Sequence, residues 1–98
     1  MSLDYAIPDP EAWETPPTQS ALRRASAAAA VVAPRMIRFD GEGGVILERR
    51  HGERKVAVYV YDDRIEFVKS WGPSPVSDME DGVVDMAALP LLVAWVTE

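Results

Sequence analysis

The fold of this chain follows from residues 55–69, which read KVAVYVYDDRIEFVK. β-Branched and aromatic residues alternate with polar ones on both sides of Asp62 and Asp63, as in strands that bury one face. Two aspartates between such runs are typical of a two-residue hairpin turn. If Tyr61 faces Arg64 across this turn, the alternation fixes the remaining pairs. The predicted pairs are Val60 with Ile65, Tyr59 with Glu66, Val58 with Phe67, Ala57 with Val68, and Val56 with Lys69.

Two earlier turns continue this hairpin without a change of register. The turn at residues 51–54 places Leu47 opposite Val58, and the glycine-rich loop at residues 40–44 places Ile37 opposite Leu47 and Phe39 opposite Val45. Because all three turns keep apolar residues on one face, residues 35–71 are predicted to form a four-stranded antiparallel meander. The residues predicted to share its inner face are Ile37, Phe39, Val45, Leu47, Val56, Val58, Val60, Ile65 and Phe67.

A helix is predicted over residues 19–32. Thr18 can cap it, alanine favours it, and Pro34 ends it. The apolar residues recur at intervals of three and four, which predicts a buried stripe. The residues of this stripe are Leu22, Ala25, Ala29 and Val32.

The last third of the chain is predicted to hold a short fifth strand and a second helix. Gly-Pro-Ser-Pro at residues 72–75 interrupts the sheet, and an acidic loop is expected through Asp81. Residues 83–86 can add an edge strand, and Pro90 can stand in the first turn of a helix. The predicted fold class is therefore α+β, with an N-terminal helix, the meander and a C-terminal helix, both helices covering one sheet face. The apolar residues of the second helix are Leu91, Leu92, Trp95 and Val96.

Length and composition predict one domain, because 98 residues can build a single core. Residues 1–17 carry acids, prolines and no base, so they are predicted to be a flexible tail ahead of a domain at residues 18–98. The chain has no cysteine, which excludes disulfides and thiolate metal sites and favours the cytoplasm. The apolar run at residues 22–33 is shorter than the roughly 20 residues that span a bilayer, so no membrane segment is predicted.

The net charge of −6 disfavours nucleic acid as a partner. The one basic cluster is formed by Arg49, Arg50, Arg54 and Lys55, and Glu48 and Glu53 dilute it. Weak nucleic-acid binding through this cluster therefore stays an alternative function.

The loop Asp40-Gly41-Glu42-Gly43-Gly44, followed by Val45 and by Leu47-Glu48, carries a resemblance. It is similar to the D-G-D/E-G-G-I/V hairpin of small uncharacterised bacterial α+β proteins, although Arg49 stands where those proteins usually have an aromatic residue. The resemblance implies no activity or cofactor. Some members are found among toxin-antitoxin-like genes, which implies an accessory or neutralising partner of a neighbouring gene product.

Two motifs suggest chemistry, and each has a structural explanation. Asp40 and Glu42 offer oxygen ligands, but two carboxylates are too few for a hard cation, and glycines at a hairpin tip supply positive φ. His51 beside Glu53 could exchange protons in a small enzyme, but no recognised motif places a nucleophile with it. We therefore predict no metal, no cofactor and no catalytic residue, with the His51 enzyme as an alternative.

The outer sheet face is the predicted binding surface, because tyrosine and arginine are enriched in protein interfaces. Its candidate residues are Ile46, Glu48, Tyr59, Tyr61, Arg64, Glu66 and Val68, with Ala57 between them. An equally simple explanation is that these residues form cross-strand pairs on a solvated sheet. Stacking of single-stranded nucleic acid on the tyrosines is disfavoured by charge. The sequence thus predicts an interaction or regulatory module that binds another protein, and an exposed first or fifth strand can also support a homodimer.

Overall fold

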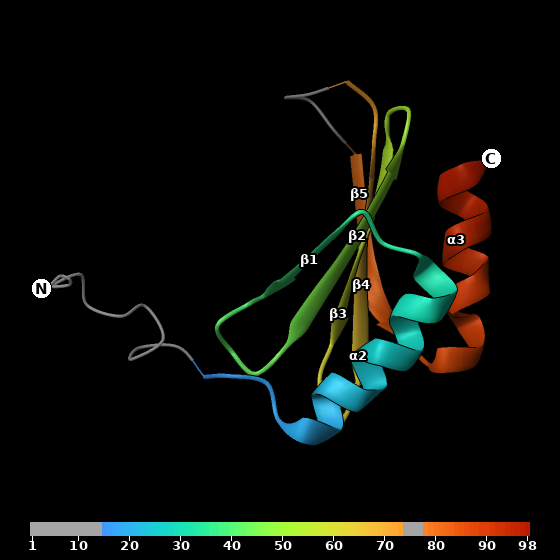
Figure 1. The fold of residues 1–98 in the computed structure, drawn as a ribbon. Helices are drawn as coiled ribbons and strands as arrows, with labels where there is room; N and C mark the ends of the chain where they lie inside the picture. The colour runs from blue at the N-terminus through green and yellow to red at the C-terminus, as the bar shows by residue number, and fades with distance from the viewer. Residues whose placement is uncertain (1–14, 74–77) are drawn as a thin grey trace, which may run out of the picture.

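The computed structural model describes residues 15–73 and 78–98 as one antiparallel sheet with two helices. The strands follow one another in the order β1-β2-β3-β4-β5, so each pairs with its neighbours in the sequence (Figure 1). This confirms the α+β class and the meander. The elements are α2 (Gln19–Val32), β1 (Met36–Phe39), β2 (Val45–His51), β3 (Arg54–Val60), β4 (Ile65–Trp71), β5 (Asp78–Val84), the 3₁₀ turn η2 (Met86–Ala88) and α3 (Leu89–Thr97).

The predicted register is confirmed at every pair. Leu47 faces Ile37 on β1 and Val58 on β3, and Val58 in turn faces Phe67 on β4. The Tyr61 N–H donates to the Arg64 carbonyl at 2.9 Å and closes the turn between β3 and β4. One face of the sheet therefore carries the apolar residues, as the alternation requires.

Helix α2 begins and ends where the sequence predicts, but its buried face is rotated. The Thr18 hydroxyl accepts a hydrogen bond from the Ala21 N–H at 3.0 Å, which caps the first turn. The residues that the helix buries are Ala21, Ala25, Ala28 and Val32. Leu22, predicted to be buried, is 43% exposed. The buried side of the helix thus consists mostly of alanines, and the larger Leu22 lies beside it, toward solvent.

Both helices contribute to one core on one face of the sheet (Figure 1). Pro90 stands in the first turn of α3, as predicted. No polar or charged side chain is buried within the described part of the chain. The members of the core from the helices are Ala25, Ala28, Val32, Leu89, Leu92 and Val96, and those from the sheet are Val45, Leu47, Val56, Val58, Val60, Ile65 and Phe67.

Strand β1 has the predicted register but contributes no residue to the core cluster. Ile37 and Phe39 lie on the inner face but are each 57% exposed. The helices pack on β2 and β3, and neither extends over β1. The alternation fixed which way these side chains point, but only the placement of the helices decides whether they are covered.

Strand β5 is longer and begins earlier than predicted. Asp78–Val84 pairs with the whole of β4, including residues expected in an acidic loop. An edge strand tolerates such exposed charges, and they also discourage pairing with other chains. Gly82 faces Phe67, and a Cβ atom built there would lie 3.0 Å from the Phe67 ring, so glycine makes room for it. Residues 74–77, which include part of the Gly-Pro-Ser-Pro stretch, lie outside the described residues.

The predicted tail reaches the described part of the chain at Thr15. The Thr15 N–H donates to the Gly41 carbonyl at 2.8 Å, and the Gly43 N–H donates to the Thr15 carbonyl at 2.9 Å. Residues 1–14, the rest of the predicted tail, lie outside the described residues. Within the residues that the structure describes, no helix is long and apolar enough to cross a membrane.

Candidate functional site

The register gathers the candidate residues on the sheet face opposite the helices. Glu48, Ala57 and Val68 form one row across β2, β3 and β4, and Ile46, Tyr59 and Glu66 form the next. Ile46 is only 3% exposed and Ala57 only 4%. These two side chains are therefore covered by their neighbours on the outer face and offer little surface to a partner.

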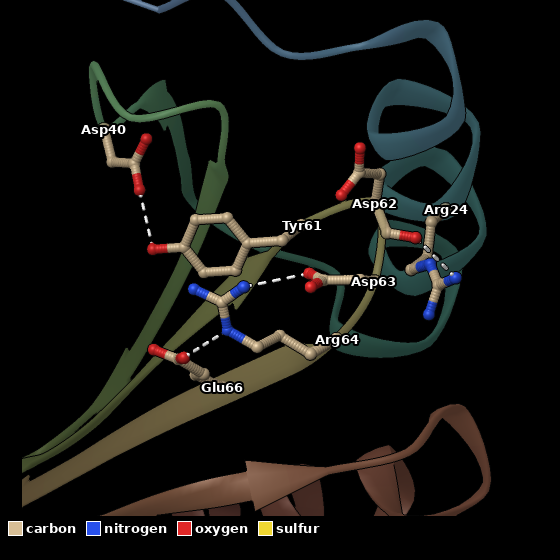
Figure 2. A network of polar contacts seen from close by, with 7 residues as sticks. All are labelled: Arg24, Asp40, Tyr61, Asp62, Asp63, Arg64 and Glu66. Carbon is tan, nitrogen blue, oxygen red and sulfur yellow. Dashed lines mark hydrogen bonds and ion pairs between the residues drawn. The ribbon is translucent and has the colours of Figure 1, made fainter.

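Asp40 organises the loop between β1 and β2. Its Oδ1 accepts hydrogen bonds from the Glu42 N–H at 2.7 Å and the Gly44 N–H at 2.8 Å, while its Oδ2 accepts one from the Tyr61 hydroxyl at 2.8 Å (Figure 2). Burial of the Asp40 carboxyl opposes its charge, but these hydrogen bonds outweigh burial and lower its pKa. Asp40 thus fixes both the turn and the tyrosine.

The glycines of this loop meet different requirements. Gly41 and Gly43 have φ angles of 81° and 87°, which disfavour residues with a side chain. Gly44 is needed for space, because a Cβ atom there would lie 2.6 Å from the Tyr61 ring and 2.7 Å from Asp40 Oδ2. The loop that carries the sequence resemblance therefore positions Tyr61 on the outer face.

Arg64 holds the other side of the Tyr61 ring. Its guanidinium lies 4.2 Å from the ring centroid and donates to Glu66 at 2.6 Å and to Asp63 at 2.9 Å (Figure 2). Such cation–π and ionic contacts restrict all the side chains involved. Tyr61, Arg64 and Glu66 therefore form a fixed frame along the hairpin turn.

Glu48 is paired within the sheet. It accepts a hydrogen bond from Arg38 at 2.8 Å and lies 3.7 Å from the Lys55 ammonium. The hydrogen bond from Arg38 is the largest cause of its lowered pKa. The charge of Glu48 is thus neutralised inside the molecule, which favours a structural role at this position.

A hollow of about 260 Å³ lies on the outer face, beside this frame. The candidate residues that line it are Tyr59, Tyr61, Glu66 and Val68, and the others are Phe67, Asp81 and Gly82. Sequence reasoning missed Asp81 and Gly82 because it placed Asp81 in a loop. The alternation of Met79, Asp81 and Val83 with Glu80 and Gly82 is the signal that could have placed Asp81 on the outer face, whereas Gly82, paired with Phe67, belongs to the inner one.

His51 lies at the opposite end of β2 from the glycine loop. It lines a hollow of about 370 Å³ together with Glu53, Arg54 and Glu98, among others. Arg54 donates to the Trp95 carbonyl at 2.7 Å and to Glu98 at 3.3 Å, whereas the His51 side chain forms no hydrogen bond or ion pair with a described residue. His51 thus shares a hollow with the carboxylates of Glu53 and Glu98 but is not bonded to either, and an enzyme based on His51 stays an alternative prediction. No group of three or more potential metal ligands occurs within residues 15–73 and 78–98.

The basic cluster is largely occupied by contacts within the molecule. Arg49 donates to the Val32 carbonyl at 2.8 Å, Arg54 binds the end of α3, and Lys55 lies near Glu48. Arg50 remains exposed, and Arg35 joins Arg49, Arg50 and Lys55 around a hollow of about 440 Å³. Nucleic-acid binding at this hollow stays an alternative prediction.

The Tyr61–Asp40 hydrogen bond predicts a loss of stability in alkali. Burial, and then the hydrogen bond to Asp40, raise the pKa of Tyr61 above its ordinary value. A raised pKa means that the folded state is stabilised below about pH 10, the pKa in the unfolded chain, and that this contribution is lost as the pH rises further. Urea unfolding at about pH 8 and about pH 11 should therefore show a larger fall in stability for the wild type than for Tyr61→Phe. An equal fall in both proteins would contradict this role of the hydroxyl.

The three hollows differ in what their side chains already bind. The basic hollow and the His51 hollow contain arginines that are tied to helix ends. In the outer hollow, Tyr59 and Asp81 form no side-chain hydrogen bond or ion pair with any described residue, while Tyr61 and Glu66 are fixed by theirs. Each hollow therefore combines held side chains with others that have no side-chain partner among the described residues, and in the outer hollow the latter include an aromatic ring and a carboxylate. Comparison of the chain with protein-family models, curated proteins and solved structures finds no match.

Proposed function

We propose that this chain is a small protein-interaction module without catalysis of its own, and that it binds its partner through the outer sheet face. The observation that carries the proposal is a hollow in which Tyr59 and Asp81, whose side chains bond to no described residue, lie beside the fixed frame of Tyr61 and Glu66. The absence of cysteine fits a cytoplasmic protein.

The fixed frame favours binding because it is ordered before the partner arrives. Association costs free energy for every side chain that must be immobilised at the interface. Tyr61 is already held by Asp40, and Arg64 by Glu66 and Asp63. A partner would therefore have to order chiefly Tyr59, a residue type whose large ring gives contact area for few rotatable bonds.

The charges around the hollow indicate the chemistry of the partner. Asp81 contributes a carboxylate with no partner among the described residues, that of Glu66 is paired with Arg64, and Val83 and Met79 on the outer side of β5 are 69% and 68% exposed. An apolar surface with acidic neighbours fits a partner that presents a basic side chain among apolar ones. The proposal is thus an acidic module that attaches to a basic protein, in keeping with an accessory or neutralising role toward a neighbouring gene product.

Replacing Tyr59 with alanine should abolish capture of this partner and leave the fold intact. Tyr59 is the suitable residue because Tyr61→Ala would also break the bond to Asp40. Loss of a central aromatic residue commonly costs 2 kcal/mol or more of binding, or about thirtyfold in affinity. The tagged protein would be used to capture binding proteins from a lysate of its source, followed by mass spectrometry and titration of the captured protein.

Leu91→Ala provides the matched control, because Leu91 is 72% exposed on α3, away from the outer face. The control should capture the same basic protein with unchanged affinity, and Asp81→Lys should lose it as Tyr59→Ala does. The proposal fails if Tyr59→Ala and Leu91→Ala capture the same proteins equally well, or if the captured protein is acidic.

A further inference from the structure

Among the residues that the structure describes, the open edge of β1 carries backbone groups that have no partner in the sheet. The Asp40 N–H donates to the Gly44 carbonyl at 3.1 Å, so Asp40 and Gly44 form a hydrogen-bonded pair. Such pairs alternate along an antiparallel ladder, which directs the N–H and C=O groups of Arg38 toward β2. The same alternation directs those of Ile37 and Phe39 toward the open edge.

The side chains of these two residues are also uncovered. Ile37 and Phe39 lie on the inner face, are each 57% exposed, and are not covered by a helix, since β1 lies at the edge of the sheet (Figure 1). An apolar edge with free backbone groups is a template for another strand. The opposite edge of the sheet is different, because β5 carries Asp78, Glu80 and Asp81 and is protected by their charge.

We propose that two copies of this chain pair antiparallel through β1, with a twofold axis at Arg38. Ile37 then lies opposite Phe39 of the second copy, and Phe39 opposite its Ile37. This register satisfies the open N–H and C=O groups of both residues in both copies. The axis is perpendicular to the sheet, so both helical layers lie on one side, and Ile37 and Phe39 from the two copies fill the trough between the two α2 helices.

The charges near the axis are compatible with this register. The Arg38 residues of the two copies lie opposite each other across the axis, on the outer face of the sheet. Each Arg38 already donates to Glu48 of its own chain at 2.8 Å. Each Arg38 therefore approaches the second copy with its charge already paired to Glu48, whose carboxylate also lies 3.7 Å from Lys55. A pairing of β1 with β5 of another copy would leave further edges open and would build chains of growing length, whereas the β1 pair closes after two copies.

Cysteine cross-linking tests the register directly, because the chain has no cysteine of its own. Arg38 and Met36 lie on the same face of β1 and are both 54% exposed. Across the axis the two Arg38 Cα atoms form a non-hydrogen-bonded pair about 4.5 Å apart, within the range of about 4.4–6.8 Å that a disulfide spans. In this register Met36 lies opposite residue 40 of the second copy. The two Met36 residues are therefore separated by four positions along the strand, more than about 10 Å. Under mild oxidation Arg38→Cys should form a covalent dimer, and Met36→Cys should not.

Sedimentation and light scattering test the dimer without a cross-link. The wild type should be a dimer, and Phe39→Lys should raise its dissociation constant at least about tenfold while an unchanged circular dichroism spectrum shows that the fold persists. Ile37→Glu combined with Phe39→Lys should restore the dimer, because the new charges face each other across the axis. A monomeric wild type, equal cross-linking of Arg38→Cys and Met36→Cys, or assemblies that grow beyond two copies would each overturn the proposal.

Discussion

Replacing Gly44 with alanine is expected to lower the free energy of unfolding by about 2–4 kcal/mol. The added Cβ would lie 2.6 Å from the Tyr61 ring and 2.7 Å from Asp40 Oδ2, so the ring and the carboxylate cannot both stay in place. Displacing them breaks the hydrogen bond between Tyr61 and Asp40 and disturbs the loop that Asp40 holds. The variant should therefore be less stable, and Tyr61 should no longer be held in its place beside the outer hollow.

Gly52→Ala is the control that separates crowding from backbone strain. Gly52 has a φ of 62°, yet no atom lies within 4 Å of its added Cβ. Strain of this kind costs about 1 kcal/mol, so Gly52→Ala should be clearly less damaging than Gly44→Ala in urea unfolding. If Tyr61 is the cause, Gly44→Ala should cost much less when Tyr61 is already alanine. Equal losses in both glycine variants, or strict additivity with Tyr61→Ala, would refute the crowding argument.

The strand register could be predicted because it depends on information close together in the sequence. Each hairpin turn fixes its own pair of strands, and a shift of one residue would have moved apolar side chains such as Val58 and Ile65 to the outer face. The burial of Ile37 could not be predicted in this way, since it depends on how far the helices extend across the sheet. The same limit explains Leu22, whose exposure depends on how α2 is rotated about its axis against the sheet.

For the candidate site, too, the sequence predicted which face each side chain lies on but not how far it is buried. Alternation placed Tyr59 and Glu66 opposite each other and on the outer face, as the structure has them. It could not show that Ile46 is buried there, because neighbouring side chains on a sheet cover one another. Alternation also could not show that β5 lines the outer hollow. The acidic residues and the glycine of that segment disfavour a strand when the segment is judged alone. That strand forms because β4 offers an edge to pair with.

Leu47→Ala is expected to cost about 3–4 kcal/mol of stability. Leu47 is 1% exposed in the centre of β2, and both helices pack on that strand. The loss combines the removed apolar surface with the cavity that remains, and a core covered by two helices cannot collapse to fill it. Thermal or urea unfolding of the purified variant, at a concentration below that at which it dimerises, would measure the effect.

Ile37→Ala is the matched comparison, because Ile37 is the direct cross-strand partner of Leu47 and has a side chain of similar size. Ile37 is 57% exposed, so its truncation in the monomer should cost only about 0.5–1 kcal/mol. The difference between the stability losses of Leu47→Ala and Ile37→Ala then shows that the helices cover β2 but not β1. At concentrations that favour the β1 pair, the cost of Ile37→Ala should rise, since the second copy buries that side chain. A concentration-independent cost for Ile37→Ala, or a cost equal to that of Leu47→Ala in the monomer, would contradict the placement of the uncovered edge at β1.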